Sequence, residues 1–303
     1  MTDLLVVEIT RGPYTESEHR VLAAEVLNGE LVRVHGPSDH AVLPRSAVKM
    51  IQATPLVESG AAAAYELGSR ELALACASHS GEADHVAAVR AWLERIGLDE
   101  SALECGAQRG RPGGPVANYC SGKHVGFLNV AVHQGLDPRG YTQAEHPVQR
   151  QVGAALRRAF DIDLAATAAT IDGCGIPVYP VPLLDLATGV ASCTHGRDRH
   201  GAPWPQARQL VEAMVAEPFL VAGTNRLCTD VMSDVPGIVA KTGAEGIYVV
   251  ASVDEPWAVA IKAIDGAERA AEAVVLDALE RAGHALSERL LARRRLHNWA
   301  GRE

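Results

Sequence analysis

Strand patterns at the two ends of the chain, with a long helical middle between them, are the feature that most constrains its fold. Near the N-terminus, residues 4–10 predict a strand, and the segments 21–27 and 30–35 flank Asn28-Gly29, a strong two-residue hairpin signal. Near the C-terminus, turn residues separate three apolar segments, 237–241, 247–253 and 257–264, which predicts an antiparallel meander. One sheet built from both ends of the chain follows from this arrangement.

The middle of the chain is predicted to be mainly helical. Helices are expected over 46–53, 56–67, 84–96, 121–134, 147–160 and 205–216, and a further one over 267–282. Residues 69–77 fit a helix or a strand, and the glycines and prolines of 98–119 indicate a long loop. We therefore expect one α/β unit of the α+β type over residues 1–303, with a sheet subdomain at about 1–45 and 235–303 and a helical region at about 46–234.

Charge and composition limit the partners of the chain. Its 303 residues carry a formal net charge of −9, which argues against nucleic acid or an anionic membrane surface, because both attract basic proteins. A small-molecule substrate fits better. No run approaches the roughly 18 apolar residues of a membrane helix, and the N-terminus lacks a secretion signal, so we expect a cytoplasmic location. The six cysteines are then expected to be reduced: Cys76, Cys105, Cys120, Cys174, Cys193 and Cys228.

Ser46 and Lys49 form a Ser-x-x-Lys pair at the start of a predicted helix. Residues three apart share one helix face, so the hydroxyl and the amine can meet, and a hydroxyl beside an amine is a potential nucleophile with its own base. Alone, such pairs are common on solvated helix faces. Here two further elements follow in the order used by serine acyl-enzymes, a serine loop at Ser78-His79-Ser80 and then Lys241-Thr242-Gly243.

Lys241 would provide the means of activating a serine. A lysine at its ordinary pKa of about 10.4 is protonated at neutral pH, and burial or a second cation must lower that pKa before the amine can act as a base. With Lys49 and Lys241 in one cleft, one amine would be neutral and the other charged. We therefore expect Ser46, Lys49, Ser78 and Lys241 to form a catalytic site; the alternative is that Lys241 only caps a strand.

Cys120 and Cys174 lie in glycine-containing loops far apart in sequence. If the two thiols meet, they form part of a metal site, with His124 or Lys123 as a third ligand. A lysine ligand would be unusual because the amine must lose its proton to donate. The alternative is that the thiols are small buried side chains with no ligand.

Together these motifs resemble the Rhizobium-type, or class 3, L-asparaginase family. The resemblance covers most of the chain and rests on five segments, Pro44-Arg45-Ser46-Ala47-Val48-Lys49, Cys76-Ala77-Ser78-His79-Ser80-Gly81-Glu82, Cys120-Ser121-Gly122-Lys123-His124, Asp172-Gly173-Cys174-Gly175 and Lys241-Thr242-Gly243-Ala244-Glu245-Gly246. It implies a fold related to serine β-lactamases and to glutaminases of that fold, and a homodimer.

The resemblance also implies roles for individual residues. It pairs the catalytic residues as two tandems, Ser46 with Lys49 and Ser78 with Lys241. It implies a zinc ion held by Cys120, Lys123 and Cys174. Substrate-binding positions are expected at Arg45, Ser80, Asp172 and His124, of which Arg45 and Asp172 match positions that line the family's pocket.

The implied reaction is hydrolysis of the side-chain amide of L-asparagine to L-aspartate and ammonia through a serine ester. Neutral Lys49 would accept the proton of Ser46 as its hydroxyl attacks, and backbone amides would stabilise the oxyanion. The sequence leaves open which serine forms the ester. It also leaves open a glutaminase or a β-lactam-recognising serine hydrolase, and a non-catalytic amino-acid binding protein.

Overall fold

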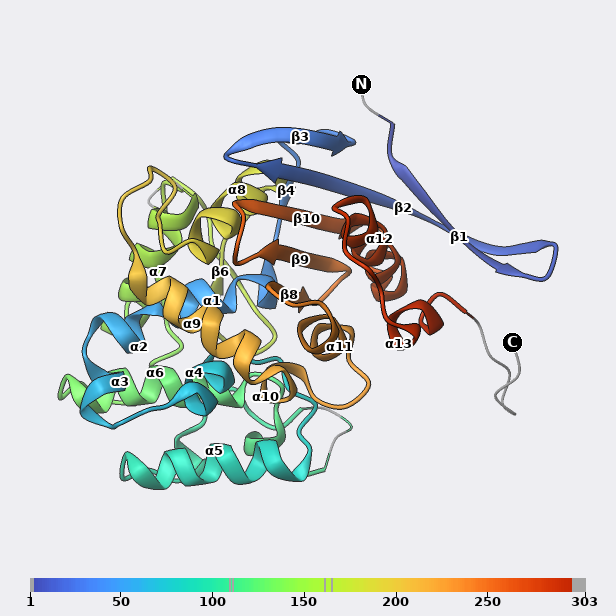
Figure 1. Ribbon diagram of the computed structural model, residues 1–303. Coiled ribbons are helices and arrows are strands. Elements are labelled where there is room, and N and C mark those ends of the chain that lie inside the picture. Colours follow the sequence, from blue (N-terminus) through green and yellow to red (C-terminus); the bar gives the residue numbers. More distant parts are fainter. Residues whose placement is uncertain (1–2, 109, 111, 161, 165, 296–303) are drawn as a thin grey trace.

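The computed structural model describes residues 3–108, 110, 112–160, 162–164 and 166–295 of the chain. It has an antiparallel sheet against which helices pack, and a larger group of helices at one end of that sheet (Figure 1). The ends of the predicted sheet subdomain, residues 1–2 and 296–303, lie outside the described residues, as do positions 109 and 111 of the predicted long loop.

The main sheet joins the two ends of the chain. Its strands are β1 (Leu5–Arg11), β2 (Tyr14–Leu27), β3 (Glu30–His35), β8 (Ile238–Gly243), β9 (Ile247–Ser252) and β10 (Trp257–Ala263). They follow the order β1-β2-β10-β9-β8, with β3 beside β2, and all pairs are antiparallel. The pairing of β2 with β10, where Ala24 lies opposite Ala260, connects the N-terminal and C-terminal strands. The predicted hairpin, meander and shared sheet are thus confirmed.

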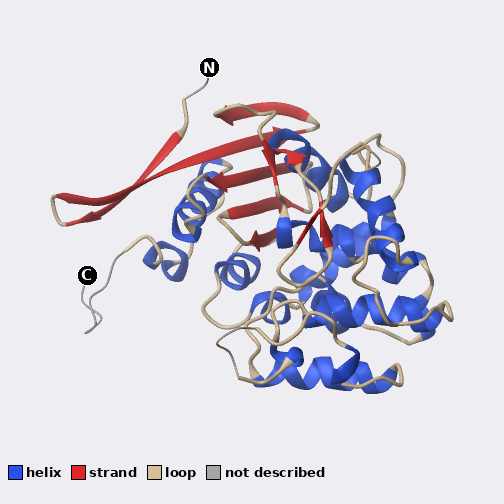
Figure 2. Cartoon of the chain, turned by 180° about the vertical axis from the view of Figure 1, so that it is seen from behind, coloured by secondary structure: helices blue, strands red, loops and turns tan. Residues whose placement is uncertain are grey.

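Strand β2 is longer than its predicted segment of 21–27. Its first half, from Tyr14, pairs with β1, and the two strands extend as a hairpin away from the rest of the protein (Figures 1 and 2). Most side chains of this extension are exposed, which removes the apolar pattern by which a strand is recognised in sequence.

The helices differ from the predictions in several bounds. They are α1 (Lys49–Gln52), α2 (Thr54–Glu58), α3 (Ala61–Ala64), α4 (Ser69–Ala75), α5 (Ala83–Arg95), α6 (Ser121–His133), α7 (Pro147–Phe160), α8 (Leu183–Thr194), α9 (Pro205–Ala216), α10 (Pro218–Ala222), α11 (Leu227–Asp234), α12 (Glu268–Arg281) and α13 (Glu288–Ala292). The ambiguous segment 69–77 is helical. The predicted helix 56–67 is wrong as one element, because Gly60, at a left-handed φ of 84°, separates α2 from α3.

Shorter elements connect these helices. A 3₁₀ turn, η1 (Arg45–Val48), precedes α1, and two more, η2 (Glu100–Ala102) and η3 (Pro115–Ala117), interrupt the loop predicted over 98–119. Two small antiparallel pairs join β4 (Ala41–Val42) to β7 (Val181–Pro182) and β5 (Thr170–Ile171) to β6 (Pro177–Val178). The predicted glycine-containing loop therefore lies between β5 and β6.

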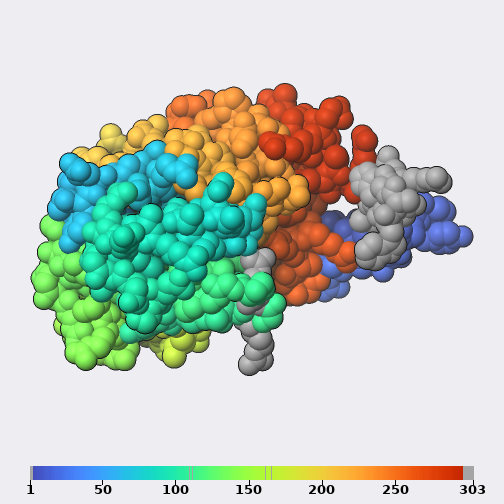
Figure 3. Space-filling model, turned by 90° about the horizontal axis from the view of Figure 1, so that it is seen from below, coloured from blue at the N-terminus to red at the C-terminus, as the bar shows by residue number. Residues whose placement is uncertain are grey.

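Helices cover both faces of the sheet. Helix α12 packs on one face of β9 and β10, while α8, which the sequence analysis did not predict, packs on β2, β9 and β10 (Figure 2). From below, the segments coloured cyan to green lie beside the orange and red C-terminal part, and the blue hairpin projects past them (Figure 3). Within the described residues, no helix combines the length and the apolar character needed to cross a bilayer.

Candidate active site

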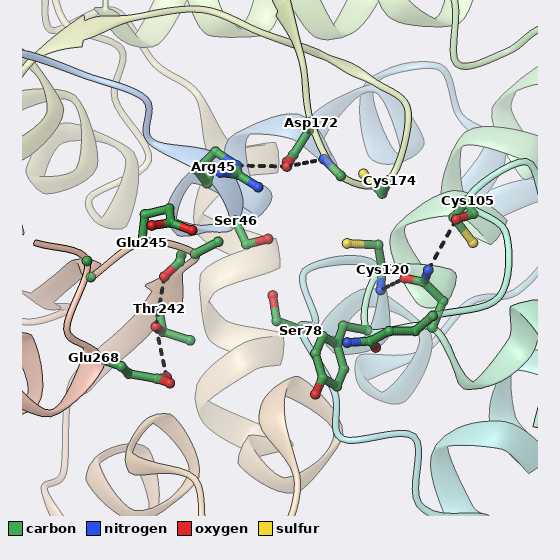
Figure 4. A pocket seen from close by; sticks show the side chains of 18 of the residues that line it. Arg45, Ser46, Ser78, Cys105, Cys120, Asp172, Cys174, Thr242, Glu245 and Glu268 are labelled. Atoms are coloured by element: carbon green, nitrogen blue, oxygen red, sulfur yellow. Dashed lines mark hydrogen bonds and ion pairs between the residues drawn. The ribbon is translucent and has the colours of Figure 1, made fainter. Parts of the chain in front are cut away.

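A pocket of about 590 Å³ lies where the sheet meets the helical region. Its walls come from segments that are distant in sequence (Figure 4). The lining residues are Arg45, Ser46, Ser78, Cys105, Ala107, Gln108, Asn118, Tyr119, Cys120, Asp172, Gly173, Cys174, Arg226, Thr242, Gly243, Ala244, Glu245, Gly246, Gly266 and Glu268. Both predicted serines therefore reach one cavity.

Close packing of backbone brings the predicted motifs together. The turn η1, which carries Ser46, lies against β8, which carries Lys241. A Cβ atom on Gly243 would lie 2.9 Å from the Pro44 carbonyl oxygen and 3.2 Å from the Ala47 nitrogen, so a residue with a side chain would push the two segments apart. The glycine of Lys-Thr-Gly is thus required by this approach.

A second close approach positions the start of α6. A Cβ atom on Gly122 would lie 2.3 Å from the carbonyl oxygen of Leu74 in α4. Because glycine occupies this position, the first turn of α6 packs directly on the end of α4, and Cys120 and Lys123 lie near the loop that carries Ser78. That loop is held in turn by the Ser78 N–H, which donates to the Val221 carbonyl at 2.8 Å.

Ser78 lies between two lysine amines. Its Oγ is 2.7 Å from Nζ of Lys241 and 3.1 Å from Nζ of Lys49. The Lys49 amine also donates to the Ala77 carbonyl at 2.5 Å and to Cys120 Sγ at 3.2 Å. Three acceptors satisfy the three N–H groups of an ammonium, so this geometry suits a charged Lys49.

The predicted contact between Ser46 and Lys49 differs from the observed one. Among the described residues, no hydrogen bond joins the Ser46 hydroxyl to either amine, although Ser46 lines the pocket. The reason is that η1 is a 3₁₀ turn and that Lys49 starts the next helix, from which its side chain reaches Ala77, Ser78 and Cys120 instead. The lysines of both predicted tandems thus meet at Ser78.

Most lysine side chains of this protein are buried next to the pocket. The chain has four lysines, and three of them are buried and bond to residues that line the pocket: Lys49, Lys123 and Lys241. Burial, followed by the positive charge of Lys49, lowers the pKa of Lys241 to about 7. Lys241 is therefore the amine with a substantial neutral fraction at neutral pH, whereas the sequence analysis assigned the neutral state to Lys49.

Cys120, Cys174 and Lys123 also meet at the pocket. Lys123 Nζ lies 3.3 Å from Cys174 Sγ, and a hydrogen bond from Cys174, together with the charges of Lys49 and Lys123, lowers the pKa of Cys120 well below its ordinary value. The pKa of Cys174 is raised by this hydrogen bond to Cys120 and then by burial. The side chains thus pair a thiolate with a thiol and an ammonium.

These three side chains fit a zinc ion by their chemistry. Two sulfurs and one nitrogen match the donors that zinc prefers, and binding would release the protons of Cys174 and Lys123. Among the described residues, no three His, Cys, Asp or Glu side chains are grouped so that they could hold a metal. A metal site in this pocket therefore depends on the Lys123 amine as its third donor.

Arg45 and Asp172 form an ion pair on one wall of the pocket. Arg45 Nε donates to Asp172 Oδ1 at 2.7 Å, and Asp172 is also bonded by the Gly173 N–H. Burial opposes ionisation of Asp172, but the nearby charges of Lys123 and Arg45 outweigh it and lower the pKa of that carboxyl. Both predicted residues therefore line the pocket as charged groups.

Ser80 and His124, predicted to bind substrate, do not line the pocket. The Ser80 hydroxyl bonds to Glu82, and His124 is fully buried, with Nδ1 2.7 Å from the Tyr141 hydroxyl. Burial and then the charge of Lys123 lower the pKa of His124 well below its ordinary value, so the ring is neutral. Their motifs are close to the site in sequence, but their side chains point elsewhere.

Sequence reasoning missed several polar residues of the pocket. Thr242 and Glu245 belong to a predicted motif but were not selected, and Arg226, Glu268 and Gln108 lie in segments without a recognisable signal. The side-chain oxygen of Gln108 is buried and has no hydrogen-bond donor among the described residues. It is an acceptor available within the pocket.

Comparison with known proteins identifies the family of the chain. A family model described as L-asparaginase II matches residues 7–303, nearly the whole chain. A search of curated proteins finds no match. The match extends over the segments that supply both serines, both lysines that bond to Ser78 and the cysteine pair, and the chain therefore belongs to the L-asparaginase II family, whose members are amidohydrolases.

Proposed function

We propose that this protein hydrolyses the side-chain amide of L-asparagine through an ester on Ser78. The observation that carries the proposal is the position of Ser78 Oγ, within hydrogen-bond distance of Lys241 and Lys49 and on the wall of a substrate-sized pocket. A general base must lie at about 2.6–3.2 Å from the proton that it removes, and Lys241 meets this requirement.

In the first half-reaction, neutral Lys241 accepts the Ser78 proton as Oγ bonds to the amide carbon. Charged Lys49 donates to Ser78 Oγ and stabilises the negative charge on that oxygen. Lys241 then passes the proton to the amide nitrogen, the C–N bond breaks and ammonia leaves. In the second half-reaction, Lys241 takes a proton from water as the water oxygen bonds to the ester carbon. Lys241 then returns the proton to Ser78 Oγ as the C–O bond of the ester breaks, which releases L-aspartate and restores the Ser78 hydroxyl.

Ser46 is the alternative nucleophile, because it lines the same pocket. Ammonia release from L-asparagine by the wild type and by Ser78→Ala, Ser46→Ala and the distant Ser192→Ala variants separates the two assignments. We expect loss of about 10³-fold or more in kcat for Ser78→Ala, because activated nucleophiles act as a unit with their base. A larger loss in Ser46→Ala, with Ser78→Ala nearly active, would transfer the ester to Ser46.

Substrate binding is proposed to use the charged wall of the pocket. Arg45 bonds to Asp172 through Nε and has further N–H groups, which suit the α-carboxylate of an amino acid. Asp172 would hold the guanidinium in place. The same wall would orient the side-chain amide toward Ser78.

Zinc is proposed as a cofactor held by Cys120, Lys123 and Cys174. The convergence of these donors supports this assignment. A bound zinc ion would supply a positive charge that orients the substrate in the pocket. It is not needed to generate a nucleophile, because a serine hydroxyl is already present.

Two further elements of the proposal concern assembly and fold. We propose a homodimer, for which sedimentation of the purified protein gives the mass directly, and a fold related to the serine β-lactamases. The competing activities are tested with the same enzyme preparation. Turnover of L-glutamine or of a chromogenic β-lactam faster than of L-asparagine would replace the proposed substrate, and asparagine binding without ammonia release would indicate a binding protein.

A further inference from the structure

One carboxylate of the pocket has no hydrogen bond and no ion pair within the described part of the chain. Five arginine, aspartate and glutamate side chains line the cavity. Arg45 is paired with Asp172 at 2.7 Å, and Arg226 is paired with Glu268 at 3.4 Å. Within the described part of the chain, the carboxylate of Glu245 forms no hydrogen bond and no ion pair. The amine of Lys262, which is not among the lining residues, attracts this carboxylate electrostatically, so Glu245 is the one lining carboxylate that is not paired with another residue of the pocket wall.

The position of Glu245 directs this charge toward the substrate. Glu245 lies in the turn between β8 and β9, with a left-handed φ of 65°, and its carbonyl accepts a hydrogen bond from Lys262 at 2.5 Å. A Cβ atom on Gly266 would lie 2.7 Å from Glu245 Oε2, so the side chain rests over a glycine that leaves room for it. Figure 4 shows the Glu245 carboxylate beside Arg45 and Ser46, facing the cavity.

An amino acid carries an ammonium and a carboxylate on the same carbon. A site that binds both groups needs a negative and a positive side chain close together, and Glu245 and Arg45 provide this combination next to Ser46. We propose that Glu245 binds the α-ammonium group of the substrate. This assignment rests on the proposed asparagine hydrolysis, in which Arg45 binds the α-carboxylate, and it makes Glu245 a residue that selects α-amino acid amides.

Glu268 does not serve equally well. Its Oε1 is bonded by Arg226 at 3.4 Å and lies 3.5 Å from the Thr242 hydroxyl, so its charge is already matched by protein groups. It is a glutamate in the same pocket with its own partners. Glu268→Gln is therefore a matched control for Glu245→Gln, since both changes replace a carboxylate with an amide of the same shape.

The test compares L-asparagine with succinamate, which has the same carboxylate and amide but lacks the α-amino group. We expect Glu245→Gln to lower kcat/KM for L-asparagine by roughly 10- to 100-fold, the size of a lost hydrogen bond to a charged group, and to leave succinamate within about twofold. Glu268→Gln should not discriminate between the two substrates. Equal losses on both substrates in Glu245→Gln, or no loss, would overturn the assignment.

Calorimetric binding of L-aspartate and succinate to the same variants separates this inference from the proposed reaction. Wild-type protein that releases no ammonia from L-asparagine would refute the reaction, yet the preference for L-aspartate over succinate still reports on Glu245. We expect that preference to fall roughly 10- to 100-fold in Glu245→Gln. A wild type that does not prefer L-aspartate, or a preference unchanged in the variant, would refute the role of Glu245.

Discussion

The charge of Lys49 is predicted to set the pH at which the enzyme becomes active. Both amines bond to the same oxygen, at 2.7 and 3.1 Å, so they lie roughly 5 Å apart, and two unit charges at that separation repel by about 3 kcal/mol at an effective dielectric constant of about 20. This repulsion corresponds to about two pKa units. Replacing Lys49 with methionine removes the charge and keeps a side chain of similar length.

The direction of the expected shift follows from the role of Lys241. The neutral amine is the active form and its pKa is about 7, so kcat/KM of the wild type should fall about tenfold per pH unit below that value. In Lys49→Met the pKa of Lys241 rises, and the acid limb should move upward by about two units. Arg226 also faces Lys241 and disfavours its charged form, while Cys228 and Cys120 favour it.

The assay is ammonia release from L-asparagine across the pH range, in the wild type, in Lys49→Met and in Lys262→Met. Lys262 is a lysine on β10 whose amine bonds to the carbonyls of Glu245 and Ala263 rather than to Ser78, so its removal should leave the acid limb unchanged. Because the chain has only four lysines, NMR titration of the labelled amines gives the same pKa when turnover is slow. An acid limb that stays near pH 7 in Lys49→Met would refute the electrostatic coupling.

Two other substitutions test the buried Lys241 amine and the proposed zinc site. Lys241→Met should raise Tm, and the rise should be larger near pH 6 than near pH 10. Because folding lowers the pKa of Lys241, the lysine destabilises the wild type fully below about pH 7, and this destabilisation disappears as the pH rises toward 10.5. Equal Tm values for the variant and the wild type in thermal scans would contradict this. Cys174→Ser should lower the zinc content found by elemental analysis, with Cys193→Ser, a buried cysteine outside the pocket, as the control; equal zinc in all three proteins would remove Cys174 from the ligand set.

The main sheet could be predicted because its signals are local. Asn28-Gly29 specifies a tight hairpin, and the glycines around residue 245 mark the turn between β8 and β9. The extension of β2 to Tyr14 could not be predicted, because its exposed side chains lack an apolar face. Helix α8 was missed as well, because it is apolar over most of its length and lacks the charged face that marks α5 and α12.

The site could be predicted in part, through residues that share a motif. The order of the Ser46, Ser78 and Lys241 motifs predicted that they would meet, but hydrogen-bond partners depend on side-chain directions that spacing does not determine. The Lys49 amine bonds to Ser78 rather than to Ser46, and the Ser80 hydroxyl bonds to Glu82. Motif spacing predicts proximity in this pocket better than it predicts contacts.

Arg226 shows why other pocket residues could not be predicted from the sequence. It follows a loop that Glu82 holds by accepting hydrogen bonds from the Thr224 N–H at 2.8 Å and from its hydroxyl at 2.7 Å. These two residues are far apart in sequence, so no local pattern places Arg226 in the pocket. Long-range contacts of this kind become visible only in the folded chain.

The serine that carries the ester can be identified by rapid quench of the enzyme with L-asparagine, digestion and mass spectrometry of the peptides. The account predicts a mass increment of one aspartyl group on Ser78, absent from Lys241→Met. The same increment on Ser46, with Ser78 unmodified, would contradict it.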